Sequence, residues 1–142
     1  MREALRLAGE GSAGEEVPVG AVVVVGGEIA GRGFNAPAAR RDPTAHAEIL
    51  AIREACARTG NYRLPGATLY CTLEPCAMCA GALVNARISR LVFGARDLRF
   101  GGVRSKFRLA DSDLLNHSVE IVEGVLGAEC TVLLQAFFKN RR

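Results

Sequence analysis

The chain has 142 residues, 49% of them hydrophobic and 23% charged, with a formal net charge of +3. These values exclude a disordered or fibrous chain and fit one globular domain with a single core. The N-terminus lacks the basic and apolar segments of a signal peptide, and the most hydrophobic run, Val22 to Val25, is far shorter than the roughly 18 residues that span a membrane. We therefore expect one domain over residues 1–142, without a membrane anchor and located in the cytoplasm.

In chain order, the first half is predicted to form two helices around a pair of strands. The glycines at positions 26 and 27 stand between apolar runs and permit the positive φ angles of a tight hairpin. Asp42-Pro43 is typical of a helix start, and Thr59-Gly60 is typical of a helix end. The pattern predicts a helix over residues 1–8, strands over 17–25 and 28–34, a loop over 35–43 and a helix over 44–59.

The second half alternates strands and helices around one long irregular segment. Pro75 is expected at the first position of a helix, and residues 96–116 have no clean periodicity, so we expect a long functional loop there. The pattern predicts strands over 67–73, 88–94 and 119–122 and helices over 75–86 and 126–138. The alternation predicts an α/β fold, a three-layer α/β/α sandwich in which helices cover both faces of a mixed five-stranded sheet.

Basic residues gather between Arg87 and Arg108, where seven of them accompany a single acidic residue, Asp97. The rest of the chain is therefore slightly acidic. Such an excess is typical of a surface that binds a polyanion, although a solvated basic face is the commoner explanation. The charge pattern alone leaves both interpretations open.

Two short motifs carry the chemistry, and each stands at the predicted N-terminus of a helix: His46-Ala47-Glu48 and Pro75-Cys76-Ala77-Met78-Cys79. In the first turn of a helix, side chains two residues apart can both reach a site beyond the helix end. The free N–H groups and the positive dipole there stabilise thiolates, the form in which cysteine binds metal. We therefore expect His46, Cys76 and Cys79 to hold one metal ion.

One imidazole and two thiolates suit zinc and leave a fourth tetrahedral position for water, as in catalytic zinc sites. Zinc lowers the pKa of its water to about 7, and Glu48, which is not a ligand, is expected to accept and return protons. The alternative is a structural zinc site closed by Cys71 or His117, which leaves Glu48 without a role. Cys56, Cys71 and Cys130 fall at apolar positions, where reduced cysteine packs as a small hydrophobe, and five cysteines are an odd number for a disulfide framework.

Longer motifs surround these residues. They are Val17-Pro-Val-Gly-Ala-Val, Asp42-Pro-Thr-Ala-His-Ala-Glu48, Thr72-Leu-Glu-Pro-Cys-Ala-Met-Cys-Ala-Gly81 and Val92-Phe-Gly-Ala-Arg-Asp97. Together they closely resemble the bacterial tRNA adenosine deaminases over nearly the whole chain. The resemblance implies a cytidine-deaminase-like fold, a homodimer, one Zn²⁺ per subunit, and conversion of the wobble adenosine of an arginine tRNA anticodon loop to inosine.

The resemblance also implies roles for individual residues. His46, Cys76 and Cys79 match the metal ligands, and Glu48 matches the residue that moves protons. The positions that match substrate contacts are Asn35, Ala47, Glu74, Pro75, Asp97, Asn116 and His117. The positions that match contacts to the anticodon loop are Phe137, Phe138, Lys139 and Arg142, although one of the two phenylalanines is expected in the core. Without the resemblance, Asn35 is equally well explained as a loop cap, and His117 as a solvated side chain.

Two other functions remain open on the sequence. The same zinc machinery would serve a deaminase of a free base or nucleotide, such as guanine or deoxycytidylate, and a zinc-stabilised RNA-binding module without catalysis is a third hypothesis. A small-molecule enzyme needs a lid that buries its substrate, whereas an RNA enzyme needs an open pocket with basic surroundings. The segment after Asp97 bears on this choice, because the family often has a small, Gly/Ala-rich stretch where this chain has Leu98 to Phe107.

Overall fold

The computed structural model describes residues 1–141, in which it contains five helices and five strands. The helices are α1 (Arg2–Ala13), α2 (Pro37–Arg40), α3 (Ala47–Thr59), α4 (Ala77–Asn85) and α5 (Gly127–Lys139). The strands are β1 (Gly20–Val25), β2 (Glu28–Phe34), β3 (Thr68–Leu73), β4 (Arg90–Ala95) and β5 (Glu120–Glu123). No helix among the described residues is long and apolar enough to cross a membrane. The predicted order of helices and strands is confirmed, with α2 as an addition.

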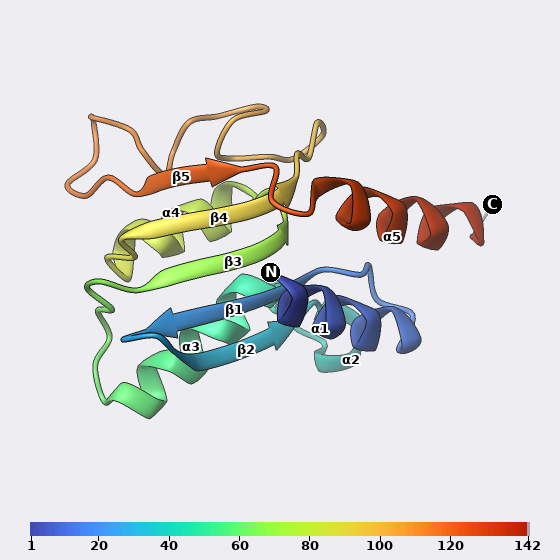
Figure 1. Ribbon diagram of the computed structural model, residues 1–142, viewed down its shortest axis with the longest axis horizontal. Helices are drawn as coiled ribbons and strands as arrows, with labels where there is room; N and C mark the ends of the chain where they lie inside the picture. The colour runs from blue at the N-terminus through green and yellow to red at the C-terminus, as the bar shows by residue number, and fades with distance from the viewer. Residues whose placement is uncertain (142) are drawn as a thin grey trace.

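One sheet holds the five strands in the order β2-β1-β3-β4-β5 (Figure 1). β1 pairs antiparallel with both β2 and β3, whereas β3, β4 and β5 run parallel. Gly26 and Gly27 form the turn between β1 and β2 with φ angles of +59° and +82°, as the sequence predicts. The mixed five-stranded sheet is therefore confirmed.

Helices cover both faces of this sheet. α1 and α5 lie on one face and contact each other, and α3 and α4 lie on the opposite face (Figure 1). Glycines let the helices approach the strands closely: a Cβ at Gly20 would lie 1.9 Å from the carbonyl oxygen of Ala4 in α1, and a Cβ at Gly31 would lie 2.1 Å from that of Ala51 in α3. The three-layer α/β/α sandwich expected from the sequence is confirmed.

Replacing Gly31 by alanine should destabilise the protein strongly, because the new methyl group overlaps the backbone of α3. We expect the free energy of unfolding to fall by about 3 kcal/mol or more. Gly9→Ala is the matched control, since a Cβ at Gly9 in α1 meets nothing within 4 Å, and alanine in a helix is favoured over glycine by about 0.5–1 kcal/mol. Urea denaturation measures both variants, and equal midpoints would contradict the close packing of α3 on β2.

The first helix and the loop after β2 differ from the sequence-based expectation. α1 continues to Ala13 instead of ending at residue 8, because Ala4, Leu7, Ala8 and Gly11 form a buried face at helical spacing. This packing outweighs the low helix propensity of the glycines in the segment. α2 interrupts the expected loop with Pro37 in its first turn, a position where proline favours a helix.

Candidate active site

α3 and α4 begin later than predicted, and both shifts shape the site. α4 begins at Ala77, so the prediction that Pro75 occupies its first position is wrong. Cys76 pairs with Gly101 in an isolated β-bridge. This pairing requires an extended backbone at Cys76, so the helix can begin only after that residue. α3 likewise begins after residue 46, whose backbone is extended, instead of at residue 44. The residue before each helix is thus an N-cap next to the free N–H groups of the first turn.

The three predicted metal ligands converge at the beginnings of these helices. The Nδ1 atom of His46 lies 3.6 Å from Sγ of Cys76 and 3.5 Å from Sγ of Cys79. All three ligand atoms lie within 4.8 Å of one another. Because two protein ligands of one tetrahedral zinc ion stand about 3.6 Å apart, the group fits zinc, with the imidazole bound through Nδ1.

The surroundings of Cys76 favour its thiolate form. A hydrogen bond from Cys79, opposed by burial and supported by a hydrogen bond with His46, lowers the pKa of the Cys76 thiol to about 4. The hydrogen bond with Cys76 in turn raises the pKa of His46. The hydrogen bond between the two cysteines raises the pKa of the Cys79 thiol, so one thiol of the pair keeps a proton that zinc binding must displace.

Glu48 lies in the first turn of α3, beside the ligands but outside their group. In residues 1–141, the cluster that could hold a metal comprises His46, Cys76 and Cys79 alone. Only 4% of Glu48 is exposed, and burial raises the pKa of its carboxyl. A raised pKa brings the carboxyl closer to neutral pH, where it can both accept and return a proton.

Neither candidate for a fourth protein ligand joins the metal group. Cys71 is fully buried in β3, where burial and the charge of the nearby Glu48 raise the pKa of its thiol well above the ordinary value. His117 hydrogen-bonds through Nε2 to the carbonyl oxygen of Ile88, 2.7 Å away. The core position predicted for Cys71 is confirmed, although no sequence pattern indicated that it would lie near Glu48. The part of the chain that the structure describes therefore favours an open zinc site.

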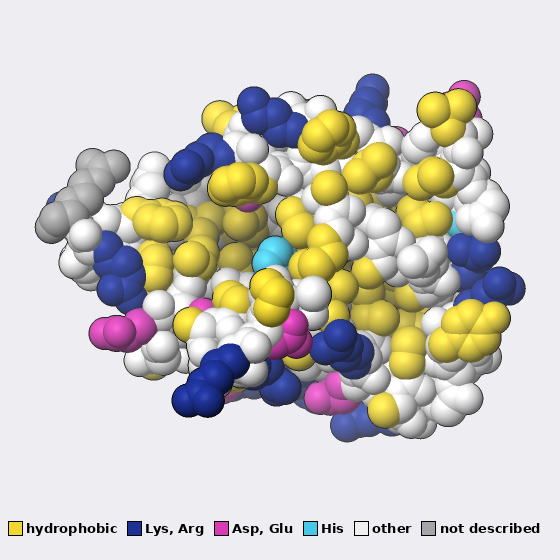
Figure 2. Space-filling model, turned by 180° about the vertical axis from the view of Figure 1, so that it is seen from behind, with side chains coloured by type: hydrophobic (Ala, Val, Ile, Leu, Met, Phe, Trp, Pro, Cys, Tyr) yellow, Lys and Arg dark blue, Asp and Glu magenta, His cyan; other side chains and the backbone are white. Residues whose placement is uncertain are grey.

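A cavity of about 610 Å³ opens beside the metal ligands, a size typical of ligand-binding sites. Figure 2 shows one face of the molecule, on which hydrophobic side chains gather around a hollow with a histidine at its margin. Three predicted substrate positions line the cavity together with Glu48: Asn35 after β2, Glu74 after β3 and Asp97 after β4. The residues that follow β2, β3 and β4 thus surround the metal site at one end of the sheet.

The sequence also matches known proteins. Residues 1–95 match the family model of the cytidine and deoxycytidylate deaminase zinc-binding region. The tRNA-specific adenosine deaminase of Haemophilus influenzae is 50% identical over all of this chain and 83% of its own length. The chain belongs to the family of tRNA-specific adenosine deaminases. The proteins of that name from Bacillus subtilis and Aquifex aeolicus are 46% and 47% identical to this deaminase, which covers 88% and 91% of their lengths.

Solved deaminase structures share the fold. One, from a study of A-to-I editing by tRNA:A34 deaminases at the wobble position of transfer RNA, matches this deaminase with a TM-score of 0.91 at 43% identity, covering 94% of this chain and 97% of the other. A guanine deaminase from Nitrosomonas europaea matches with a TM-score of 0.82 at 25% identity, covering 96% and 81%. The cytidine-deaminase-like fold is thus confirmed. The zinc-binding family and the ligand geometry together establish Zn²⁺ as the cofactor.

Four predicted substrate positions of this deaminase do not line the cavity. Asn116 and His117 precede β5. His117 hydrogen-bonds to Ile88, which lies just before β4, at the end of the sheet opposite to the metal ligands. The separation along the strands is roughly 20 Å. Ala47 and Pro75 are buried and do not line the cavity. Ala47 and Pro75 thus lie between residues that line the cavity, whereas one chain does not bring Asn116 and His117 to it. The contacts of all four with substrate remain predictions.

The last helix contributes one aromatic ring to the cavity. Phe137 is buried, whereas Phe138 is 49% exposed and lines the cavity, so the expectation that one of the pair belongs to the core is confirmed. Their rings meet edge to face with centroids 5.2 Å apart. Lys139 is exposed at the end of α5, and Arg142 lies outside the described residues.

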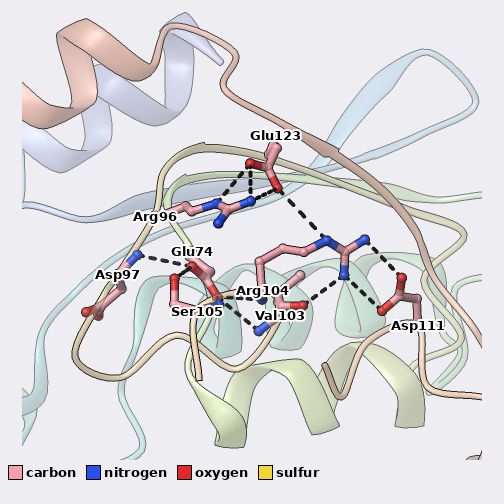
Figure 3. Close-up of polar contacts among 8 residues, drawn as sticks. All are labelled: Glu74, Arg96, Asp97, Val103, Arg104, Ser105, Asp111 and Glu123. Carbon is pink, nitrogen blue, oxygen red and sulfur yellow. Dashed lines mark hydrogen bonds and ion pairs between the residues drawn. The ribbon is translucent and has the colours of Figure 1, made fainter. Parts of the chain in front are cut away.

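The carboxylate of Glu74 binds the loop after β4 (Figure 3). It accepts backbone N–H bonds of 2.8–3.1 Å from Asp97, Val103, Arg104 and Ser105, and another from the Ser105 hydroxyl. Burial would raise the pKa of this carboxyl, but the Ser105 hydroxyl and the backbone donors together lower it. The sequence pointed to Glu74 only as a substrate contact, and this role in ordering the loop was missed.

Glu74→Gln should destabilise the deaminase by about 2–3 kcal/mol, because the amide presents N–H donors to backbone N–H groups that need an acceptor. Glu123→Gln is the matched control: its carboxylate pairs with Arg96 and Arg104 nearer the surface, where an ion pair contributes about 0–1 kcal/mol. Chemical denaturation measures both free energies of unfolding. Equal losses in the two variants would contradict the assignment of Glu74 as the main anchor of the loop.

Part of the basic segment between Arg87 and Arg108 forms ion pairs with acidic residues of the same chain. Three of its side chains form ion pairs: Arg90 with Glu120, Arg96 with Glu123, and Arg104 with Asp111. Arg99 instead lines the cavity, where its guanidinium lies 5.4 Å from the ring centroid of Phe100. The polyanion-binding interpretation therefore applies best to the part of the segment next to the cavity.

Proposed function

We propose that residues 1–142 form one deaminase domain that converts adenosine to inosine at the wobble position of a tRNA anticodon, and that the substrate is an arginine tRNA. The observation that carries this proposal is the convergence of His46, Cys76 and Cys79 beside the unligated Glu48 at an open cavity. The relatives named tRNA-specific adenosine deaminases, which are 43–50% identical over the whole chain, support the choice of substrate.

The proposed reaction replaces the amino group on C6 of adenine with the oxygen of water and releases ammonia. Zinc held by His46, Cys76 and Cys79 would supply a water of pKa about 7 as the nucleophile. Glu48 would take a proton from the attacking water and give it to N1 of the ring. It would then carry the proton of the new C6 hydroxyl to the amino group, which leaves as ammonia. The raised pKa of its buried carboxyl suits both directions of transfer.

Other residues of the cavity are assigned to binding. The side-chain amide of Asn35 offers both a donor and an acceptor to the edge of the base. Asp97 lies at the mouth, where its Oδ1 accepts N–H bonds of 3.0 and 3.1 Å from Arg99 and Phe100 and so fixes the rim. Phe138 and Lys139, at the end of α5, are placed to contact the nucleotides around the target.

Deamination of a free base is the second candidate, favoured by the fold shared with a guanine deaminase. The mouth of the cavity favours the polynucleotide instead. Among the described residues it carries exposed side chains, including Leu98 at 73% and Phe100 at 64%, in place of a lid that would bury a small substrate. A zinc-stabilised RNA-binding module without catalysis would leave the buried carboxyl of Glu48 without a role.

We also propose that this deaminase acts as a homodimer in the cytoplasm. Leu114 and Leu115, in the loop before β5, are 90% and 44% exposed. Exposed apolar side chains of this kind are suited to burial against a second copy of the chain. Light scattering of the purified protein tests the dimer.

The experiment that tests the proposed function uses an arginine tRNA anticodon stem-loop with adenosine at the wobble position. Purified protein is incubated with this RNA, and inosine is measured after digestion to nucleosides. Free guanine is supplied in parallel, with ammonia release as the readout. Inosine from the stem-loop without ammonia from guanine is the expected result, and ammonia from guanine without inosine would replace the proposal by the second candidate.

A further inference from the structure

The turn formed by Leu98, Arg99 and Phe100 exposes apolar surface at the mouth of the cavity. Leu98 is 73% exposed and Phe100 is 64% exposed, and all three residues line the cavity. Large apolar side chains held in water beside a binding site are typical of surfaces that contact a ligand. The zinc chemistry and the proposed proton transfers use none of these three side chains.

This turn is fixed to the zinc site by hydrogen bonds. The Asp97 carboxylate accepts the N–H groups of Arg99 and Phe100, and the Asp97 carbonyl accepts that of Gly101. Gly101 pairs in turn with the zinc ligand Cys76. Phe100 is therefore one residue from a backbone that is bonded to the metal site. The backbone that carries its ring is ordered before any ligand binds, which reduces the entropy lost on binding.

The same attachment extends to the residues that follow the turn. A Cβ at Gly101 would lie 2.3 Å from the Glu74 carboxylate, and a Cβ at Gly102 would lie 2.7 Å from the backbone nitrogen of Ala77. The loop backbone thus packs directly on Glu74 and on the first turn of α4. Figure 3 shows Glu74 beside Asp97 and Ser105, with hydrogen bonds to both, and Arg104 bound to Asp111 and Glu123.

The chemistry of the turn fits a nucleobase of a single strand. Unpaired bases bind proteins by stacking on aromatic rings and on guanidinium planes, while cations hold the phosphates. Phe100 supplies the ring, and Arg99 supplies a guanidinium 5.4 Å from the ring centroid. Among residues 1–141, the ion pairs of the structure leave Arg99 without a carboxylate partner. It is therefore available for a phosphate.

We infer that Phe100 is a stacking platform for the nucleobase next to the target adenosine, with Arg99 as the phosphate contact beside it. This inference rests on the proposed function, because a target base that enters the cavity from a polynucleotide leaves its neighbours at the mouth. The platform binds substrate and takes no part in proton transfer. Its loss therefore changes KM for RNA much more than kcat.

The test compares variants that keep or remove an aromatic ring at position 100. Phe100→Ala and Phe100→Leu should raise KM for the anticodon stem-loop by roughly tenfold, because both remove a stacking ring. Phe100→Tyr keeps the ring and should stay close to the wild type. Inosine formation is followed over a range of RNA concentrations, so that KM and kcat are separated.

Tyr62→Ala is the matched control. Tyr62 is 73% exposed, and the Arg63 guanidinium lies 5.3 Å from its ring centroid, so its local chemistry resembles that at Phe100. It lies in the loop before β3, outside the cavity lining. This variant should leave KM unchanged.

Three outcomes would overturn the inference while leaving the proposed function in place. If Phe100→Leu had the wild-type KM, an apolar side chain would be sufficient at position 100 and stacking would not be required. If Phe100→Ala had the same KM as Tyr62→Ala, the stacking role of Phe100 would be ruled out, and adenosine deamination would be unaffected. Light scattering could instead show that Phe100→Ala has a smaller molecular mass than the wild type, while its KM is unchanged at high protein concentration. That result would mean that the ring contacts a second copy of the chain. Absence of inosine with the wild-type chain would overturn the proposed function itself, and the platform with it.

Discussion

Glu48→Gln should lower kcat for inosine formation by about a hundredfold to ten-thousandfold, the range that a positioned acid or base contributes. Glutamine preserves the size and burial of the side chain but can neither take a proton from water nor give one to the adenine ring. The carboxyl it replaces is 4% exposed with a raised pKa, so no bulk water substitutes for it efficiently. Single-turnover measurements with the anticodon stem-loop give the rate directly.

Zinc content separates this effect from damage to the metal site. Because Glu48 lies outside the ligand group, the glutamine variant should bind as much zinc as the wild type. Glu54→Gln is the matched control, since Glu54 lies on the exposed side of the same helix and should leave kcat unchanged. A Glu48→Gln enzyme that keeps its zinc and works within about tenfold of the wild-type rate would rule out the proton-carrying role.

Cys76→Ala should remove zinc from the protein, because a site with three protein ligands loses one of its two thiolates. The folded chain then also loses the stabilisation that zinc binding provides, about 4 kcal/mol when free zinc exceeds its dissociation constant a thousandfold. Elemental analysis of the purified variant measures the zinc, and thermal unfolding with and without added zinc measures the stabilisation. The wild-type transition should shift with zinc, and the variant transition should not.

Cys56→Ala provides the matched control for this substitution. Cys56 is a free, half-buried cysteine near the end of α3, away from the beginning of the helix where the ligands converge. It should keep one zinc ion per chain and the zinc-dependent shift. Full zinc content in Cys76→Ala, or equal loss in both variants, would be incompatible with the ligand assignment.

The metal site could be predicted from the sequence because its signals are local. His46 and Glu48 share one helical turn, Cys76 and Cys79 share another, and both turns follow recognisable helix-start signals. The antiparallel pairing of β1 with β2 also followed from a local pattern, namely the Gly-Gly hairpin. What these patterns could not give was the helix starts to the residue, since the bridge between Cys76 and Gly101 joins segments far apart in the chain.

The loop after β4 was the least predictable part of the site. Its order comes from Glu74, whose hydrogen-bond partners lie 23–31 residues further along the chain. No periodicity marks such contacts, because they depend on where the two chain segments meet in the fold. The same limit explains why Asn116 and His117, matched to substrate positions by resemblance, lie away from the cavity, and why α1 extends through glycines that favour a loop when considered alone.

X-ray absorption spectroscopy of the zinc-loaded protein tests the central claim most directly, because it counts the atoms that bind the metal. The account predicts one zinc ion per chain with two sulfur ligands and one imidazole nitrogen from the protein, and the same spectrum for Glu48→Gln. A third sulfur or a second imidazole would mean that Cys71, His117 or another side chain closes the site. That result would contradict an open zinc centre beside a free carboxyl.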